Sequence, residues 1–274
     1  STSNLFQDLA VFIFSFLANS FPPAFAKIFV NFSSLDGLYI LHFFKPLHIS
    51  GLIISLSLNF LSNDKIILSC LFQISFALSY LQKNLKFTHN DLHIDNIMYQ
   101  KTDKLFLYYK FNNIYFKVPT HGYIFKIIDF GRAIFTFKEK IFFSDCFCKY
   151  GDADGQYNYP INNFLYDKKK EKKDIIKPNY HFDMCRLSMT ILDELNYSKY
   201  IDYKDNKYII DYLYSLTIGE NNIEFNELED NFDMYVSIAK HANNSLPIDI
   251  IQNDIFKPFR IKKKHFPRSL YYHL

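Results

Sequence analysis

The chain has 274 residues, 49% of them hydrophobic, which is enough for one large domain or two small ones with a sizeable core. Its formal net charge of +3 is too small to indicate a nucleic-acid-binding protein. Its four cysteines are too few and too scattered for a secreted disulfide framework, so we expect free thiols and a cytoplasmic protein. The alternative is a metal held by Cys146 and Cys148 with Cys185 or His181, although zinc ligands usually come in paired clusters.

Two uncharged stretches, residues 9–26 and 46–63, are about long enough to span a bilayer. The first contains Asn19 and a pair of prolines, and the second contains His48, a glycine and several serines. We therefore expect buried core rather than membrane spans. No basic stretch precedes the first, so the sequence does not indicate a signal peptide either.

The N-terminal part predicts a short mixed region. Residues 4–19 fit an apolar helix that ends before Pro22. Short strands are expected at 27–32 and 38–44, on either side of the turn sequence SSLDG.

A long buried helix is predicted at 64–85, with Asp64 near its N-terminus, where a negative charge is stabilising. A cluster of strands follows, because apolar runs rich in Phe, Tyr and Ile are separated by short turn sequences. The expected strands are 96–100, 104–111, 113–118 and 123–130, with turns at 101–103, 112–113 and 119–122.

The remainder predicts a long loop and then helices. Residues 138–178 are polar and irregular, and the lysine run at 168–173 reads as a solvated loop. Helical periods follow at 182–195, 228–242 and 248–256, and the basic tail after them is expected to be solubilising. Strands and helices occur in blocks rather than alternating, which predicts an α+β fold.

Three polar residues stand among these apolar runs. Asp91 and Asn96 lie in HNDLHIDNIM, a loop between the long helix and the first strand of the cluster, and Asp129 follows a later strand in KIIDFGRA. Each alone could be a turn or cap residue. Together they suit Mg²⁺, because this ion binds few protein oxygens and completes its coordination shell with phosphate and water. One carboxylate then remains to receive or orient a hydroxyl proton, as phosphoryl transfer requires. We expect Gly131 to let the chain turn sharply after the strand.

These motifs resemble the protein-kinase-like superfamily, whose catalytic and metal loops read His-x-Asp-Leu-x-x-x-Asn and Asp-Phe-Gly. The resemblance implies a kinase-like fold in which Asp91 is the catalytic base and Asn96 and Asp129 bind Mg²⁺ and so reach ATP. It also implies that His89 braces the catalytic loop. Asp183, in FDMCRL, would be the buried acid that anchors the backbone of that loop.

The resemblance covers roughly residues 64–195 well and the rest of the chain thinly. Within that range, GDADGQYN and PNYHFDMCRL are also similar to segments of kinase-like proteins of large DNA viruses. It implies a viral protein located in the host cytoplasm or the virion.

The family pattern is incomplete before the catalytic loop. No Gly-rich phosphate loop occurs there, and the first glutamate of the chain is Glu139, so the usual Lys–Glu ion pair of the smaller lobe has no Glu. We expect the chain to begin inside that lobe, with residues 1–48 as a partial N-terminal lobe and 49–274 as a mainly helical C-terminal lobe. The alternative is a reduced kinase fold that no longer transfers phosphate.

Three further departures carry expectations. Asn90 replaces the Arg that meets a phosphorylated activation loop in many protein kinases, so we expect no need for such phosphorylation. His93 replaces a Lys, and Asp-Leu-His also resembles small-molecule kinases of the choline and aminoglycoside type. The long interval between Asp91 and Asp129 predicts an inserted hairpin at 103–122.

The leading hypothesis is a monomeric, ATP- and Mg²⁺-dependent serine/threonine-protein kinase that acts on protein substrates, without nucleic acid or membrane. A small-molecule kinase and a catalytically inactive pseudokinase that serves as a binding module are the alternatives.

Overall fold

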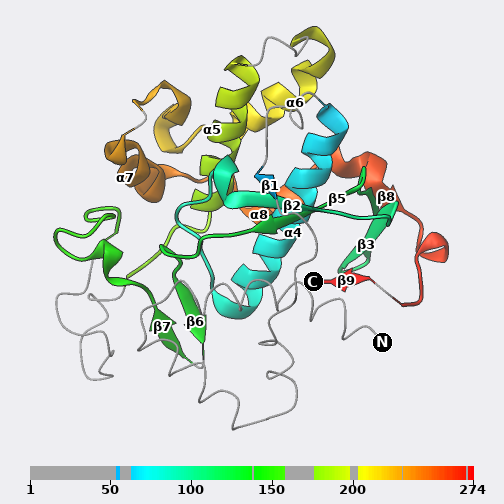
Figure 1. Cartoon of the computed structure of the whole chain (residues 1–274), viewed down its shortest axis with the longest axis horizontal. Helices are drawn as coiled ribbons and strands as arrows, with labels where there is room; N and C mark the ends of the chain where they lie inside the picture. The colour runs from blue at the N-terminus through cyan, green and yellow to red at the C-terminus, as the bar shows by residue number, and fades with distance from the viewer. Residues whose placement is uncertain are drawn as a thin grey trace.

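The structure, a computed structural model, describes residues 54–55, 63–137, 139–157, 176–197, 203–229, 231–269 and 271–274 (Figure 1). The described part is α+β, which agrees with the predicted class and is compatible with a kinase-like fold. The predicted helix at 4–19, the strands at 27–32 and 38–44, the expected lobe at 1–48 and most of both uncharged stretches lie outside the described residues.

Helix α4 (Asp64–Leu85) forms the centre of the described part, as predicted (Figure 1). It begins at Asn63, whose side chain caps the helix by accepting from the backbone N–H of Lys65, and it ends at Lys86 in the left-handed conformation. Among the described helices, α4 is the one long and apolar enough to cross a bilayer, but 78% of its apolar window is buried in the protein. It is therefore the core helix expected from its apolar character.

Three short strands lie beside this helix in the order β1-β2-β5. Strand β2 (Ile97–Lys101) pairs antiparallel with β5 (Tyr123–Ile127), with Ile97 opposite Ile127, and β1 (Ile54–Ser55) pairs with the other edge of β2. Both longer strands were predicted. Because β2 and β5 run antiparallel, the residues just before β2 and just after β5 meet at one end of the sheet.

The inserted hairpin predicted at 103–122 is confirmed. Strands β3 (Phe106–Phe111) and β4 (Ile114–Pro119) pair along their full length around the turn at Asn112. The C-terminal segment extends this hairpin, because β8 (Arg260–Ile261) pairs with β4 and β9 (Tyr272–His273) runs parallel to β3. The basic tail is thus solvated only in part: lysines 262–264 are exposed, whereas both strand segments belong to the sheet.

Residues 138–178 were expected to be irregular, and the structure differs at the start of this segment. Strands β6 (Phe135–Phe137) and β7 (Lys140–Phe142) form a small antiparallel pair at its start, and the rings of Phe135 and Phe142 stack at 5.1 Å between centroids. Three residues a strand are too few for a detectable alternation of polar and apolar residues. The lysine run at 168–173 lies outside the described residues.

Helices make up most of the rest, as predicted. The α-helices are α5 (Phe182–Tyr197), α6 (Tyr203–Ser215), α7 (Phe232–His241) and α8 (Pro247–Ile250). Short 3₁₀ turns occur at η2 (Ile94–Asn96), η3 (Asp145–Phe147), η5 (Glu220–Asn222), η6 (Phe225–Glu227), η7 (Asp254–Phe259) and η8 (Lys263–His265). Helix α4 contacts α6, α8, β4 and β5, so the sheets and the helices share one core.

Phe72 joins the parts of this core. Its ring is fully buried near the middle of α4. Five aromatic rings from α4, β3, β4 and η7 lie within 4.8–6.2 Å of it between centroids, namely Phe76, Tyr109, Phe116, Phe256 and Phe259. One side chain therefore holds the helix, the inserted hairpin and the C-terminal segment together.

Replacing Phe72 with Ala should lower the free energy of unfolding by about 3–5 kcal/mol, because the cavity would lose contacts with all three parts at once. Urea denaturation measures this loss. Tyr150→Ala, at an 87% exposed aromatic residue, is the control and should stay within about 0.5 kcal/mol of the wild type. A Phe72→Ala loss no larger than the control's would contradict the role assigned to Phe72.

Candidate active site

The three predicted site residues lie at one end of the β2–β5 pair. Asn96 immediately precedes β2, Asp129 follows β5 by two residues, and Asp91 lies in the loop between α4 and β2. The backbone N–H of Ile128 donates to the carbonyl of Asn96 at 3.0 Å, which joins the two strand ends. The structure thus brings together segments that are far apart in the sequence.

Asp183 holds the loop in place from the first turn of α5. Its carboxylate is fully buried and accepts two backbone hydrogen bonds of 2.8 Å, from the N–H groups of His89 and Asn90. Burial raises the pKa of Asp183 to about 7, more than the two N–H donors lower it. Two turns further along the same helix, the hydroxyl of Thr190 accepts a hydrogen bond from the backbone N–H of Ile94 at 3.1 Å. The prediction that Asp183 is a buried acid anchoring this loop is confirmed.

His89 ties the loop to the segment that carries Asp129. The ring is buried, and its Nε2 lies 2.8 Å from the carbonyl oxygen of Ile128. A carbonyl only accepts, so Nε2 carries the proton. Burial lowers the pKa of His89, which favours the neutral ring, and Phe130 packs beside it at 5.3 Å between centroids. The bracing position predicted for His89 is confirmed.

Asn90 links the loop to the segment after β7. It adopts a left-handed conformation, φ +64°, which Asn tolerates better than most residues. Its Nδ2 group donates to Thr88 Oγ1 and to the carbonyl of Arg132, both at 3.0 Å. Its Oδ1 accepts from the Tyr157 hydroxyl at 2.8 Å, and its carbonyl accepts from Gln156 at 3.1 Å. The contacts of this buried side chain are therefore hydrogen bonds to neutral groups.

The amide of Asn96 has a defined orientation. Its Nδ2 group donates to the carbonyl of Asp91 at 2.8 Å and to Nε2 of His93 at 3.0 Å. Both partners must be acceptors, so Nε2 of His93 is unprotonated. The other amide atom, Oδ1, is the one that can coordinate a cation. His93 therefore contacts Asn96 and not the Asp91 carboxylate.

The turn after β5 differs from the expectation. The left-handed residue is Asp129 itself, φ +57°, whereas Gly131 has no positive φ. A non-glycine residue in this region is strained, a feature common at functional sites. At Gly131 the backbone N–H donates to Asp129 Oδ1 at 3.3 Å, and a Cβ there would make a tight contact of 3.3 Å with the same oxygen. Phe130 between them is fully buried.

The carboxylate of Asp91 has two side-chain neighbours that the sequence did not indicate. Its Oδ1 accepts from the Tyr235 hydroxyl at 2.9 Å, and its Oδ2 lies 3.7 Å from Nε of Arg132. Tyr235 belongs to α7, 144 residues away, and its hydroxyl accepts from Nε of Arg186 at 3.3 Å. The side chain of Asp91 is 20% exposed, so it remains accessible.

The donor atoms at the two strand ends are of a type that suits a magnesium ion. Asn96 Oδ1 and the exposed carboxylate of Asp129 are hard oxygen donors, the type that Mg²⁺ prefers. Within the described ranges, no group of three or more His, Cys, Asp or Glu side chains could hold a metal ion. A cation at Asn96 and Asp129 would therefore complete its shell with phosphate and water.

The four cysteines are free. Cys70 and Cys185 are buried, and burial raises the pKa of both thiols far above the usual range. Cys146 Sγ lies 2.7 Å from the hydroxyl of Ser144, and within the described segments Cys146 belongs to no group of three or more His, Cys, Asp or Glu side chains that could hold a metal ion. The alternative metal site at 146–148 thus gains no support.

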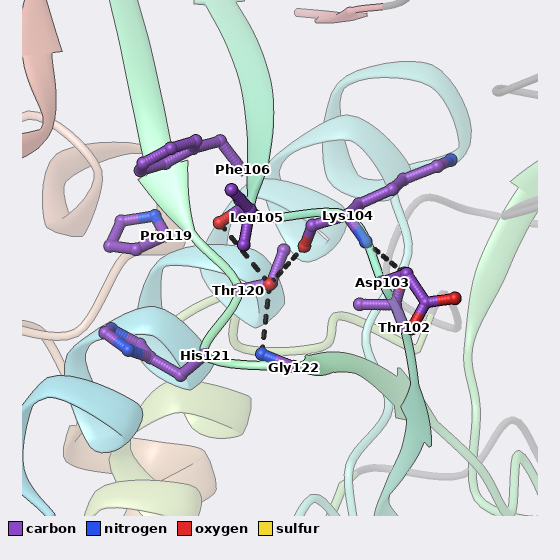
Figure 2. Close-up of a pocket in the computed structure, with 9 residues that line it drawn as sticks. All are labelled: Thr102, Asp103, Lys104, Leu105, Phe106, Pro119, Thr120, His121 and Gly122. Atoms are coloured by element: carbon purple, nitrogen blue, oxygen red, sulfur yellow. Dashed lines mark hydrogen bonds between the residues drawn. The ribbon is translucent and has the colours of Figure 1, made fainter.

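A surface hollow lies away from these residues. Figure 2 shows it at the base of the inserted hairpin, lined by Thr102, Asp103, Lys104, Leu105, Phe106, Pro119, Thr120, His121 and Gly122. The Thr120 hydroxyl donates to the carbonyl of Lys104 and accepts from the N–H of Gly122, which closes the hairpin base. Thr102 and Gly122 stand at the opposite ends of β2 and β5 from Asn96 and Asp129, so the hollow is no part of the candidate site.

The comparisons with known proteins give partial support for a relationship to protein kinases. No protein-family model matches the chain. A putative serine/threonine-protein kinase of Acanthamoeba polyphaga mimivirus is 26% identical over 210 residues, which is 69% of this chain and 46% of that protein. Serine/threonine-protein kinase haspin of Mus musculus is 29% identical over 104 residues, 38% of this chain and 14% of haspin.

An uncharacterized protein of Invertebrate iridescent virus 6 is 42% identical over 85 residues, 29% of this chain and 14% of that protein. The chain thus spans less than half the length of each of these relatives. The similarities relate it to protein-kinase-like proteins, two of the three relatives being viral.

Sequence reasoning missed four side chains of the site. Gln156 and Tyr157 lie in a segment that supports the resemblance, and Arg132 follows the Asp-Phe-Gly motif directly. No spacing rule, however, indicated that the first two contact Asn90 or that Arg132 lies near Asp91. No feature of the sequence indicated Tyr235 as a site residue, because it fits the helical periodicity of residues 228–242 like its neighbours.

The buried carboxyl of Asp183 should make stability depend on pH. Its pKa is about 7 in the folded chain, against an ordinary value of 3.8. Between these values the folded state keeps a proton that the unfolded state releases, so this group's contribution to stability is full below about pH 4 and is lost as the pH rises through 7.

Asp183→Asn, which does not titrate, isolates the effect. The wild type's free energy of unfolding, minus that of the variant, should fall from pH 4 to pH 7 in urea titrations. A difference that is constant or rises over this range would show that Asp183 ionises near its ordinary pKa.

Proposed function

We propose that the chain catalyses ATP- and Mg²⁺-dependent phosphoryl transfer to Ser or Thr of a protein substrate. The observation that carries the proposal is the pair of backbone hydrogen bonds to Asp183, together with the His89–Ile128 contact. These bonds hold the segments of Asp91 and Asp129 in one arrangement. A positioned base beside two cation ligands is the minimum equipment of phosphoryl transfer.

In this proposal the Asp91 carboxylate takes the proton of the acceptor hydroxyl while the hydroxyl oxygen forms a bond to the phosphoryl group. Asn96 Oδ1 and the Asp129 carboxylate would hold Mg²⁺, which would neutralise charge on the phosphates. ATP would supply the phosphoryl group, with ADP as the leaving group. His93 serves the same end indirectly, because it fixes the amide of Asn96. Phe130, buried beside His89, keeps the Asp129 turn in place.

A protein substrate is favoured by the named kinases among the relatives, which are serine/threonine-protein kinases. We further propose a monomeric viral protein that works in the host cytoplasm or virion, without nucleic acid or membrane. The small-molecule kinase and the pseudokinase are alternative outcomes of the assay below.

Asp91→Asn and Asp129→Asn should each lower phosphate transfer to a peptide array by about 10²–10⁴-fold, since one removes the base and the other a cation ligand. Asp103→Asn is the matched control: it removes an exposed carboxylate from the hairpin and should leave the rate unchanged. Thermal melts establish that all three variants fold.

Transfer that survives both active-site substitutions would overturn the assignment. Phosphate on an amino alcohol or aminoglycoside, with none on peptides, would select the small-molecule kinase. A folded wild type without any transfer would select the pseudokinase.

Treatment with a protein phosphatase should leave the transfer rate within about twofold of the untreated protein. The side chain of Asn90 is a neutral amide, buried and hydrogen-bonded to Tyr157, so it offers no cation to a phosphorylated residue. Mass spectrometry of both samples confirms removal of phosphate. A rate that disappears with the phosphate would contradict this expectation.

A further inference from the structure

Helix α7 reaches the proposed catalytic base through one hydroxyl group. Tyr235 donates to Asp91 Oδ1 at 2.9 Å and accepts from Nε of Arg186 at 3.3 Å. A chain of hydrogen bonds thus runs from a guanidinium on α5 through a phenol on α7 to the carboxylate. A hydrogen bond to an ionised carboxylate is stronger than one between neutral groups.

The ring of Tyr235 is held on several sides. The guanidinium carbons of Arg132 and Arg186 lie 5.4 and 5.1 Å from its centroid, within the range of cation–π contacts. Phe232 stacks on it at 6.1 Å, and Phe182 lies at 5.9 Å. Arg186 is itself buried. The direction of the hydroxyl is therefore set before any substrate arrives.

The other side chains near Asp91 do not orient it as directly. His93 points its Nε2 at Asn96, and Arg132 Nε stays 3.7 Å from Oδ2, beyond hydrogen-bond distance. Among the described side chains, Tyr235 alone donates a hydrogen bond to the Asp91 carboxylate. Because a carboxylate has two oxygens, the bond at Oδ1 leaves Oδ2 for an incoming hydroxyl.

We propose that Tyr235 is a positioning residue for phosphoryl transfer: its hydroxyl, held by Arg186, fixes Asp91 so that Oδ2 faces the acceptor hydroxyl. This inference rests on the proposed function. It assigns α7 a part in the reaction, since the helix carries the group that orients the base.

Tyr235→Phe tests the inference, because it removes one oxygen and keeps the ring among its neighbours. It should lower kcat about 10- to 100-fold, the effect expected for a hydrogen bond to a charged group, and leave the KM for ATP within twofold. Tyr208→Phe is the matched control, since it removes a similar bond of 2.8 Å, from Tyr208 to Asp64, at the start of α4. It should leave kcat unchanged.

A second substitution separates positioning from general support of the fold. In the Asp91→Asn background, Tyr235→Phe should cause no further loss of the residual rate, because the carboxylate that it orients is gone. Arg186→Lys is a further variant, because it removes the Nε donor to Tyr235 but keeps the positive charge. It should lower kcat and leave the KM for ATP unchanged. It tests the same inference if the Tyr235→Phe variant folds poorly.

The outcomes separate this inference from the function on which it rests. A wild type with no turnover overturns the proposed function and this inference with it. Wild-type turnover with kcat of Tyr235→Phe equal to that of Tyr208→Phe overturns this inference alone. A further loss in the Asp91→Asn background as large as in the wild type would also overturn it, because the hydroxyl would then act through the fold.

Discussion

The arrangement of the site depends on one buried carboxylate. Asp183 accepts the N–H groups of two consecutive loop residues, and without it both donors would be buried and unpaired, at a cost of about 1–3 kcal/mol each. The same bonds fix the left-handed turn at Asn90, and so they direct the His89 ring toward Ile128. The position of Asp91 relative to Asp129 is thus set by helix α5 rather than by either loop.

Hydrogen bonds do much of the ordering that charges do in many protein kinases. Asn90 uses neutral partners to connect the loop with Gln156 and Tyr157, and the phenol of Tyr235 contacts Asp91 more closely than Arg132 does. Such bonds depend less on salt than exposed ion pairs do, because buried groups are weakly screened. The described part of the site is thus connected largely through packing and hydrogen bonds to neutral groups.

The hairpin β3–β4 shows how the fold accommodates a long segment between β2 and β5. It lies at the opposite end of β2 and β5 from Asn96 and Asp129, so its length does not alter the site. Its apolar face packs on Phe72, and the C-terminal segment adds a two-residue strand to each of its edges, so the outer strands of this sheet are very short. The insertion and the C-terminus therefore stabilise each other.

The sequence by itself predicted the long helix, the four strands after it with the hairpin among them, and Asp91, Asn96 and Asp129 as candidate site residues, because these depend on local periodicity and short motifs. It also indicated Asp183 and His89, through motifs. Only the tertiary structure decided that Tyr235 contacts Asp91, that the C-terminal segment joins the hairpin and that Asp129, not Gly131, takes the left-handed turn. The first two contacts join residues more than a hundred positions apart, and a local pattern contains no information about which distant side chain will pack there.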